Sequence, residues 1–109
     1  MITNKQMRIV KMNATVSSKQ DALLINGHLD FTTVPLIWQQ SVPLLTRDTI
    51  HVIDFSDVKS SSSAALALIL EYIRYAENHQ KTYQLKGISQ KLLTIAKAAG
   101  IEAILKKYM

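Results

Sequence analysis

The stretch DFSDVKSSSSAAL, residues 54–66, runs from a strand through a polar serine segment into an apolar helix, and this junction decides the fold. Residues 50–55 are rich in β-branched side chains and are bounded by polar turns, which predicts a buried strand. Residues 58–63 are interpreted as a polar serine loop. Residues 64–78 carry apolar side chains on two faces at helical spacing, which predicts a largely buried helix.

Upstream of this junction, the sequence predicts two strands and a helix. Short strands are expected at residues 12–17 and 22–26, with a turn between them and Gly27 closing the second strand. A threonine at residues 32–33 is expected to cap the following helix. Pro35 is compatible with this helix because proline is tolerated in a first turn. Pro43 lies inside the helical pattern, so we expect it to kink the helix or to end it near the preceding residue.

Downstream of the junction, a short strand is predicted at residues 82–85. Ser89 is expected to cap a last helix that Gly100 terminates, and residues 101–105 to add a short strand or turn. The later strand–helix–strand unit should give parallel strands with a right-handed crossover. The sequence therefore predicts an α/β fold with helices packed on one small sheet.

The composition of the chain bounds its class and location. Its 109 residues suit one domain, and the 48% of apolar residues argue against disorder. We interpret residues 1–11 as a flexible N-terminal arm and residues 12–109 as the domain. Cysteine is absent, no apolar run approaches a membrane span, and the N-terminus lacks the apolar core of a signal peptide. We therefore expect a soluble, cytoplasmic protein.

The net charge of +5 comes largely from the C-terminal third. There, a single acid accompanies six lysines: Lys81, Lys86, Lys91, Lys97, Lys106 and Lys107. Because they are spaced out and not interleaved with aromatic residues, a solvated face is favoured over a contact surface for nucleic acid or anionic lipid.

No residue pattern indicates catalysis or a cofactor. The three histidines, His28, His51 and His79, lack partners at metal-ligand spacing, and the glycine-rich phosphate-binding motifs are absent. Asp54 and Asp57 are interpreted as carboxylates that solvate a strand end rather than as a catalytic pair. We therefore expect a non-enzymatic protein that requires no metal and no cofactor.

The serine run at residues 60–63 has two readings. One serine can cap the following helix by accepting a hydrogen bond from its first free N–H groups. Four serines also leave exposed hydroxyls beside the positive end of a helix dipole, a position that suits a functional surface.

Residues 54–66 resemble the signature of the STAS family, D-L-S-x-V-x-x-x-D-[ST]-[SG]-G-L, at a strand–helix junction. Matching positions are Asp54, Ser56, Val58, Ser63 and Leu66, and residues 27–30 (GHLD) resemble the family's G-E-L-D turn. Residues 34–38 (VPLIW) and the block at residues 85–97 are similar to the MlaB type of STAS domain. The resemblance covers about residues 14–105. It implies a mixed sheet of about four or five strands with helices packed on it.

The MlaB type also implies a function. Such a protein binds the cytoplasmic, MlaF-like ATPase subunit of an ABC transporter that moves phospholipids between membranes, together with a membrane permease. It supports assembly and activity of the ATPase, and it reaches the inner membrane only through that partner. The resemblance places the contact at Ser63, with Ser61 and Ser62 beside it. Trp38 is either a further anchor or a core residue.

A second function follows from the same family. Ser63 stands where anti-sigma-factor antagonists carry the serine or threonine that is phosphorylated. Two departures disfavour such a switch, because Ser62 replaces the family's aspartate and Ala65 replaces its usual glycine. The antagonist remains the alternative to the ATPase adaptor.

Overall fold

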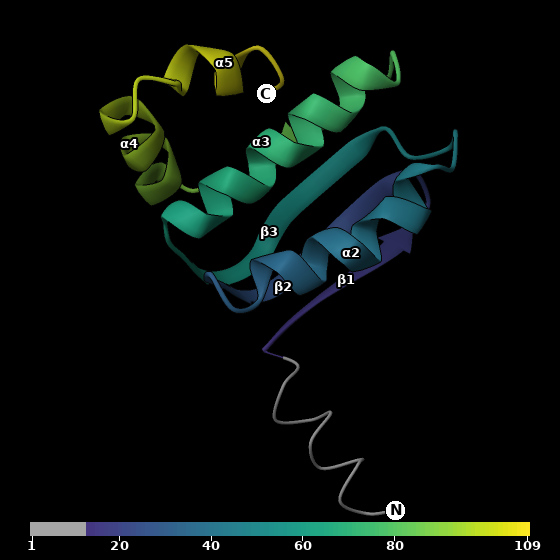
Figure 1. Ribbon diagram of the computed structural model, residues 1–109, viewed down its shortest axis with the longest axis horizontal. Helices are drawn as coiled ribbons and strands as arrows, with labels where there is room; N and C mark the ends of the chain where they lie inside the picture. The colour runs from purple at the N-terminus through teal and green to yellow at the C-terminus, as the bar shows by residue number, and fades with distance from the viewer. Residues whose placement is uncertain (1–12) are drawn as a thin grey trace, which may run out of the picture.

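The fold is one four-stranded sheet with its helices on one face (Figure 1), as the computed structural model of residues 13–109 describes it. The predicted arm at residues 1–11, and Met12, lie outside the described residues. The strands are β1 (Ala14–Lys19), β2 (Ala22–Leu29), β3 (Val52–Ser61) and β4 (Gln84–Lys86), in that spatial order. The helices are α2 (Val34–Leu45), α3 (Ser63–Asn78), α4 (Gln90–Ala98) and α5 (Glu102–Lys106).

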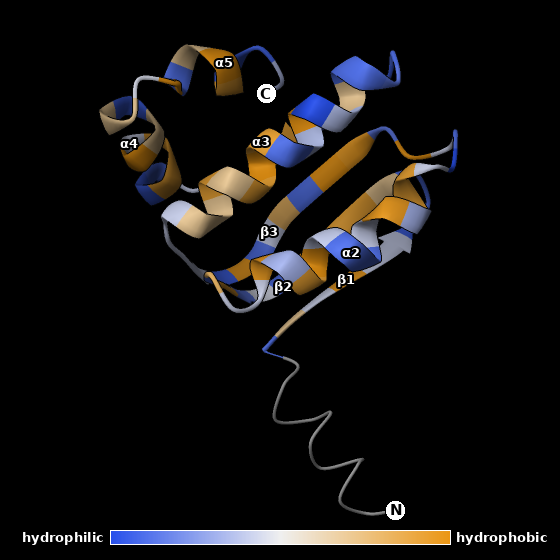
Figure 2. Ribbon diagram, viewed as in Figure 1, coloured by the Kyte–Doolittle hydropathy of each residue, from blue (hydrophilic) through white to orange (hydrophobic). Residues whose placement is uncertain are grey.

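The sheet is mixed, as the sequence predicts. β1 and β2 form an antiparallel pair, while β2–β3 and β3–β4 are parallel. Alternate residues of the strands face the helices, so the core collects on that face. Figure 2 shows the resulting alternation of hydrophobic and hydrophilic residues along the β3 ribbon. The expected order of elements is confirmed, and a fourth helical segment is added at the C-terminal end of the described residues.

β2 continues through Gly27 to Leu29, so the prediction that Gly27 ends this strand is wrong. Gly27 has a φ of +105° and lies against β1, where a side chain would meet the carbonyl oxygen of Asn13. It marks an irregularity inside the strand rather than its end, because a glycine lets two backbones approach closely.

α2 runs through Pro43 to Leu45, so of the two outcomes predicted for Pro43, a kink or an end near Val42, the end near Val42 is wrong. Proline removes one N–H donor, and in the last turn this loses only one intrahelical hydrogen bond. The helix has no side-chain cap from Thr33. Instead, a carboxylate oxygen of Asp30 accepts hydrogen bonds from the N–H groups of Thr32 (2.8 Å) and Thr33 (2.9 Å).

β3 extends through the serine run to Ser61, so the predicted serine loop at residues 58–63 is wrong. Pairing with β2 explains the extension, because Val58 lies opposite Gly27 and Ser61 opposite Leu29. Two register shifts interrupt this pairing, and the exposed serines project from a strand rather than from a loop. Tertiary pairing here overrides the weak strand preference of serine.

α3 is buried over much of its surface, as predicted. Tyr72 lies at its centre with no exposed surface, and its hydroxyl is 2.7 Å from Ser41 Oγ of α2. Ser41 Oγ in turn donates to the carbonyl oxygen of Ile37 at 2.7 Å. Burial raises the pKa of Tyr72, so the phenol stays neutral and the polar pair is satisfied inside the core.

The C-terminal segment confirms one prediction and corrects another. Ser89 Oγ accepts a hydrogen bond from Leu92 N–H at 3.1 Å and caps α4 as expected. The short strand or turn expected at residues 101–105 is the helix α5. Leu105 anchors this helix in the core, and a Glu102–Lys106 contact of 3.5 Å spans one turn on its surface.

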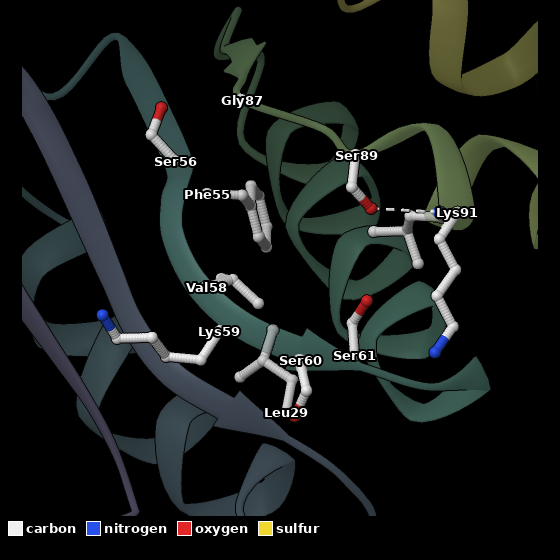
Figure 3. Close-up of a pocket in the computed structure, with 11 residues that line it drawn as sticks. Leu29, Phe55, Ser56, Val58, Lys59, Ser60, Ser61, Gly87, Ser89 and Lys91 are labelled. Carbon is white, nitrogen blue, oxygen red and sulfur yellow. Dashed lines mark hydrogen bonds between the residues drawn. The ribbon is translucent and has the colours of Figure 1, made fainter.

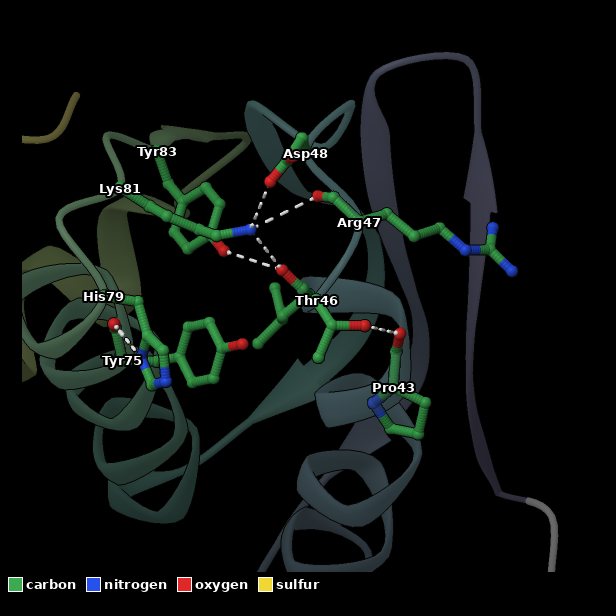
Figure 4. A network of polar contacts seen from close by, with 9 residues as sticks. Pro43, Thr46, Arg47, Asp48, Tyr75, His79, Lys81 and Tyr83 are labelled. Atoms are coloured by element: carbon green, nitrogen blue, oxygen red, sulfur yellow. Dashed lines mark hydrogen bonds and ion pairs between the residues drawn. The ribbon is translucent and has the colours of Figure 1, made fainter.

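Five of the six C-terminal lysines are exposed, whereas Lys81 is half-buried and makes contacts that hold two segments together (Figure 4). Its ammonium donates to the carbonyl oxygen of Leu45 at 2.8 Å and lies 3.7 Å from Asp48 Oδ1. These contacts join the C-terminal end of α2 to the segment after α3. The solvated face predicted for the lysines therefore excludes Lys81.

Candidate functional site

The three serines at the end of β3 have different surroundings. Ser62 is the N-cap of α3, and its Oγ accepts a hydrogen bond from Ala64 N–H at 3.2 Å. Ser63 is the first residue of the helix, and its side chain is exposed. Ser61 is half-buried and lines a pocket beside β3. The helix cap is thus Ser62, and the exposed hydroxyl beside the helix start belongs to Ser63. The cap interpretation and the surface interpretation each apply to one serine of the run.

Replacing Ser62 with alanine should lower the free energy of unfolding by about 1 kcal/mol, because the first turn of α3 loses its cap. The hydroxyl also donates to the carbonyl oxygen of Leu29 at 3.4 Å, and that longer bond is lost as well. Urea denaturation measures the change. Ser63→Ala is the matched control and should change stability by less than about 0.5 kcal/mol. Equal losses in both variants would contradict the assignment of the cap.

The loop between β2 and α2 lies at the same end of the sheet. Leu29 pairs with Ser61, and His28 Nδ1 lies 2.6 Å from Ser60 Oγ. Hydrogen bonds from the N–H groups of Thr33 and Thr32 hold the pKa of Asp30 below its usual range, so this carboxylate stays charged. The carboxyl ends of parallel strands are where open α/β sheets commonly bind ligands and partners.

Phe31 projects from this loop with 74% of its surface exposed. It follows β2 directly, and so it lies at the sheet end where β3 passes into α3. Leu36, in the first turn of α2, is 44% exposed. Together with Ser63 and the exposed Ala67, these residues form what we call the Ser63 surface. The sequence analysis missed Phe31, because one exposed aromatic residue in a turn leaves no periodic pattern.

Trp38 packs between α2 and α3. Its ring centroid lies 5.6 Å from that of Tyr72 and 6.3 Å from that of Tyr75, in tilted and edge-on arrangements. The side chain is half-buried against the core. Core packing therefore accounts for its burial, and only its remaining exposed part is open to a partner.

A pocket of about 290 Å³ opens between the C-terminal half of β3 and the start of α4 (Figure 3). We call it the β3–α4 pocket. Its side chains come from three segments far apart in the sequence, and they combine an apolar floor with serines and two lysines. The lining residues are Leu29, Phe55, Ser56, Val58, Lys59, Ser60, Ser61, Gly87, Ser89, Lys91 and Leu92.

Among residues 13–109, no three His, Cys, Asp or Glu side chains gather in a geometry that could hold a metal ion. Asp54 Oδ1 accepts a hydrogen bond from Ser56 N–H at 2.8 Å. Burial opposes its ionisation, but the hydrogen bonds from Ser56 and the charge of Lys86 outweigh burial and lower its pKa. Asp54 is therefore charged, and its carboxylate holds the backbone of Ser56.

None of the helices between residues 13 and 109 has the length and apolarity that a membrane span requires.

A family model described as "Mlab, STAS domain" matches residues 12–106. The chain belongs to this STAS-domain family. The resemblance drawn from residues 54–66 is thereby confirmed, and with it the predicted STAS fold. Among solved structures, the anti-sigma factor antagonist SpoIIAA in its unphosphorylated form is similar, with a TM-score of 0.61 and 17% identity over 83% of each chain. At this identity the likeness shows the fold alone. No curated protein matches the chain.

Ser63, which the signature aligns with the phosphorylated residue of anti-sigma-factor antagonists, lies at the exposed start of α3. The position before it carries the capping Ser62 instead of an aspartate. An aspartate would cap a helix equally well but would add a negative charge to this surface. The substitution thus keeps the helix start and leaves the Ser63 surface without that charge.

Proposed function

We propose that this STAS domain is a non-enzymatic adaptor that binds the cytoplasmic ATPase subunit of an ABC transporter for intermembrane phospholipid transport. The observation that carries the proposal is the match of residues 12–106 to the MlaB type of STAS domain. In this role the protein supports assembly and activity of the ATPase. It is cytoplasmic and reaches the inner membrane only through the complex of ATPase and permease.

The Ser63 surface is the proposed docking site. It offers an exposed aromatic side chain, Phe31, at the same end of the sheet as the exposed small side chains of Ser63 and Ala67 in the first turns of α3. Aromatic residues, phenylalanine included, are enriched at protein interfaces, where they bury much apolar area. Ser62 supports the surface from beneath as the cap of α3. Trp38 contributes through its partly exposed ring at the α2–α3 contact.

Purification from native membranes tests the proposed partner. A tagged full-length chain, isolated from detergent extracts, is expected to carry an ABC ATPase with its permease, identified by mass spectrometry. The alternative, an antagonist controlled by phosphorylation of Ser63, predicts a sigma-regulating kinase in their place. Recovery of that kinase without an ATPase would overturn the proposed function. An untagged extract, processed in parallel, controls for unspecific retention.

A further inference from the structure

β3 is longer than the strand beside it. β4 pairs only with Val52, Ile53 and Asp54, and the ladder stops at the pairing of Asp54 with Lys86. From Ser56 to Ser61, β3 keeps β2 on one side, but within residues 13–109 no strand lies on the other. An unpaired strand edge presents N–H and C=O groups that can hydrogen-bond with another extended chain.

The rest of this side of the sheet is covered. Leu85 of β4 donates its N–H to the carbonyl oxygen of Tyr108 at 2.7 Å, so the C-terminal segment satisfies part of the outer edge of β4. Gly87, just after β4, packs against the backbone of Ser56, and beyond this contact the β3–α4 pocket opens beside residues 57–61. β1 also ends the sheet, but the β3–α4 pocket does not border it. The edge at residues 57–61 thus combines a backbone without a neighbouring strand with an adjacent cavity.

The pocket offers both apolar and charged contacts to such a chain. Phe55 and Leu92, each 3% exposed, form its floor with Leu29 and Val58. Among residues 13–109, the charged residues that line it are Lys59 and Lys91. Figure 3 shows Lys91 reaching along the α4 side of the pocket, while Lys59 projects from β3 away from α4. An apolar floor below a positively charged rim complements a chain that alternates apolar and acidic side chains.

We propose that residues 57–61 of β3 bind an extended acidic segment of a partner protein by strand addition, with its alternate apolar side chains in the β3–α4 pocket. Backbone hydrogen bonds to the open edge supply affinity, and the pocket and its lysines select the side chains. This site is separate from the Ser63 surface, because the exposed Ser63 and Phe31 do not line the pocket. The inference therefore holds whichever partner occupies the Ser63 surface.

A synthetic hexapeptide, Glu-Val-Glu-Val-Glu-Val with blocked ends, provides the probe. Titrated into the full-length chain at low salt, it is expected to shift the NMR signals of residues 56–61 and 87–92. It should also slow hydrogen exchange at alternate amides of residues 57–61, because the strand pairing protects every second N–H. The corresponding Lys-Val peptide is expected to leave these signals unchanged.

Two controls separate strand addition from loose charge attraction. A Glu-Val peptide that is N-methylated at every residue has no backbone N–H to donate to β3 and should not bind. Lys91→Glu should weaken peptide affinity about fivefold or more, since it replaces an attraction by a repulsion. Lys97→Glu makes the same charge change on α4, outside the pocket, and should leave affinity within about twofold.

Several outcomes would overturn the proposal. These are the absence of binding by the Glu-Val peptide, equal binding of its N-methylated form, and equal effects of the two lysine variants. Slow exchange, before any peptide is added, of those amides of residues 57–61 that point away from β2 would do so too, because a second copy or another segment of this chain would then already occupy the edge. Sedimentation analysis of the same sample distinguishes these two occupants.

Discussion

Replacing Gly27 with alanine is expected to lower the free energy of unfolding by at least about 3 kcal/mol. Two costs add at this position. The φ of +105° is one that side chains rarely adopt, and an added Cβ would lie 2.2 Å from the carbonyl oxygen of Asn13 and 2.8 Å from Ala14 Cα. Both neighbours are backbone atoms of the β1–β2 pair, so neither can rotate away. Urea denaturation followed by circular dichroism measures the loss.

Gly100→Ala is the matched control, because Gly100 also has a positive φ, +78°, but no atom within 4 Å of an added Cβ. It should cost only the backbone strain, about 1 kcal/mol. The difference between the two variants reports the close approach of β1 and β2. Equal losses in the two variants would show that the backbones of β1 and β2 lie farther apart at Gly27 than in the structure.

Periodicity and turn chemistry in the sequence predict most of the architecture. The helical spacing from Leu66 to Tyr75 predicts the buried α3, and Ser89 predicts the start of α4; the structure confirms both. Each of these signals is local, since a cap or an apolar stripe depends on residues within a few turns. The order of strands and helices follows from them.

Non-local contacts explain where the sequence interpretation fails. Ser60 and Ser61 resemble a loop in isolation, yet pairing with His28 and Leu29 draws them into β3. Residues 101–105 form a helix because Leu105 is anchored in the core. Such contacts decide short or polar segments, whose intrinsic preference is weak.

The candidate sites likewise divide into features that local sequence predicts and features that depend on non-local contacts. The STAS signature locates the Ser63 region, because its residues are contiguous in the sequence. The β3–α4 pocket has no sequence signal, since Leu29, Val58 and Lys91 come from separate segments that only the fold brings together. Likewise, the signature does not show that Ser62 caps the helix while Ser63 stays exposed, because that distinction depends on where β3 ends.

Ser63→Glu is expected to weaken binding of the ATPase subunit at least about a hundredfold while leaving the fold intact. Under the proposed function, the partner covers Ser63, so a carboxylate there would be buried without a counter-charge, at a cost of several kcal/mol. In the free domain the same carboxylate lies in the first turn of α3, near the positive end of the helix dipole, and should be neutral or slightly stabilising. Isothermal titration calorimetry with the purified ATPase measures the affinity, and thermal unfolding measures the stability.

Gln90→Glu provides the matched control for Ser63→Glu. Gln90 is the first residue of α4, follows the capping Ser89 and is exposed, so its carboxylate meets the same helix-end environment outside the Ser63 surface. Affinity for the ATPase should then remain close to that of the unmodified protein. Ser63→Ala should have only a mild effect, because a small side chain still fits beneath the partner. Unchanged affinity of Ser63→Glu would exclude the Ser63 surface as the docking site, even if the ATPase itself is recovered as the partner.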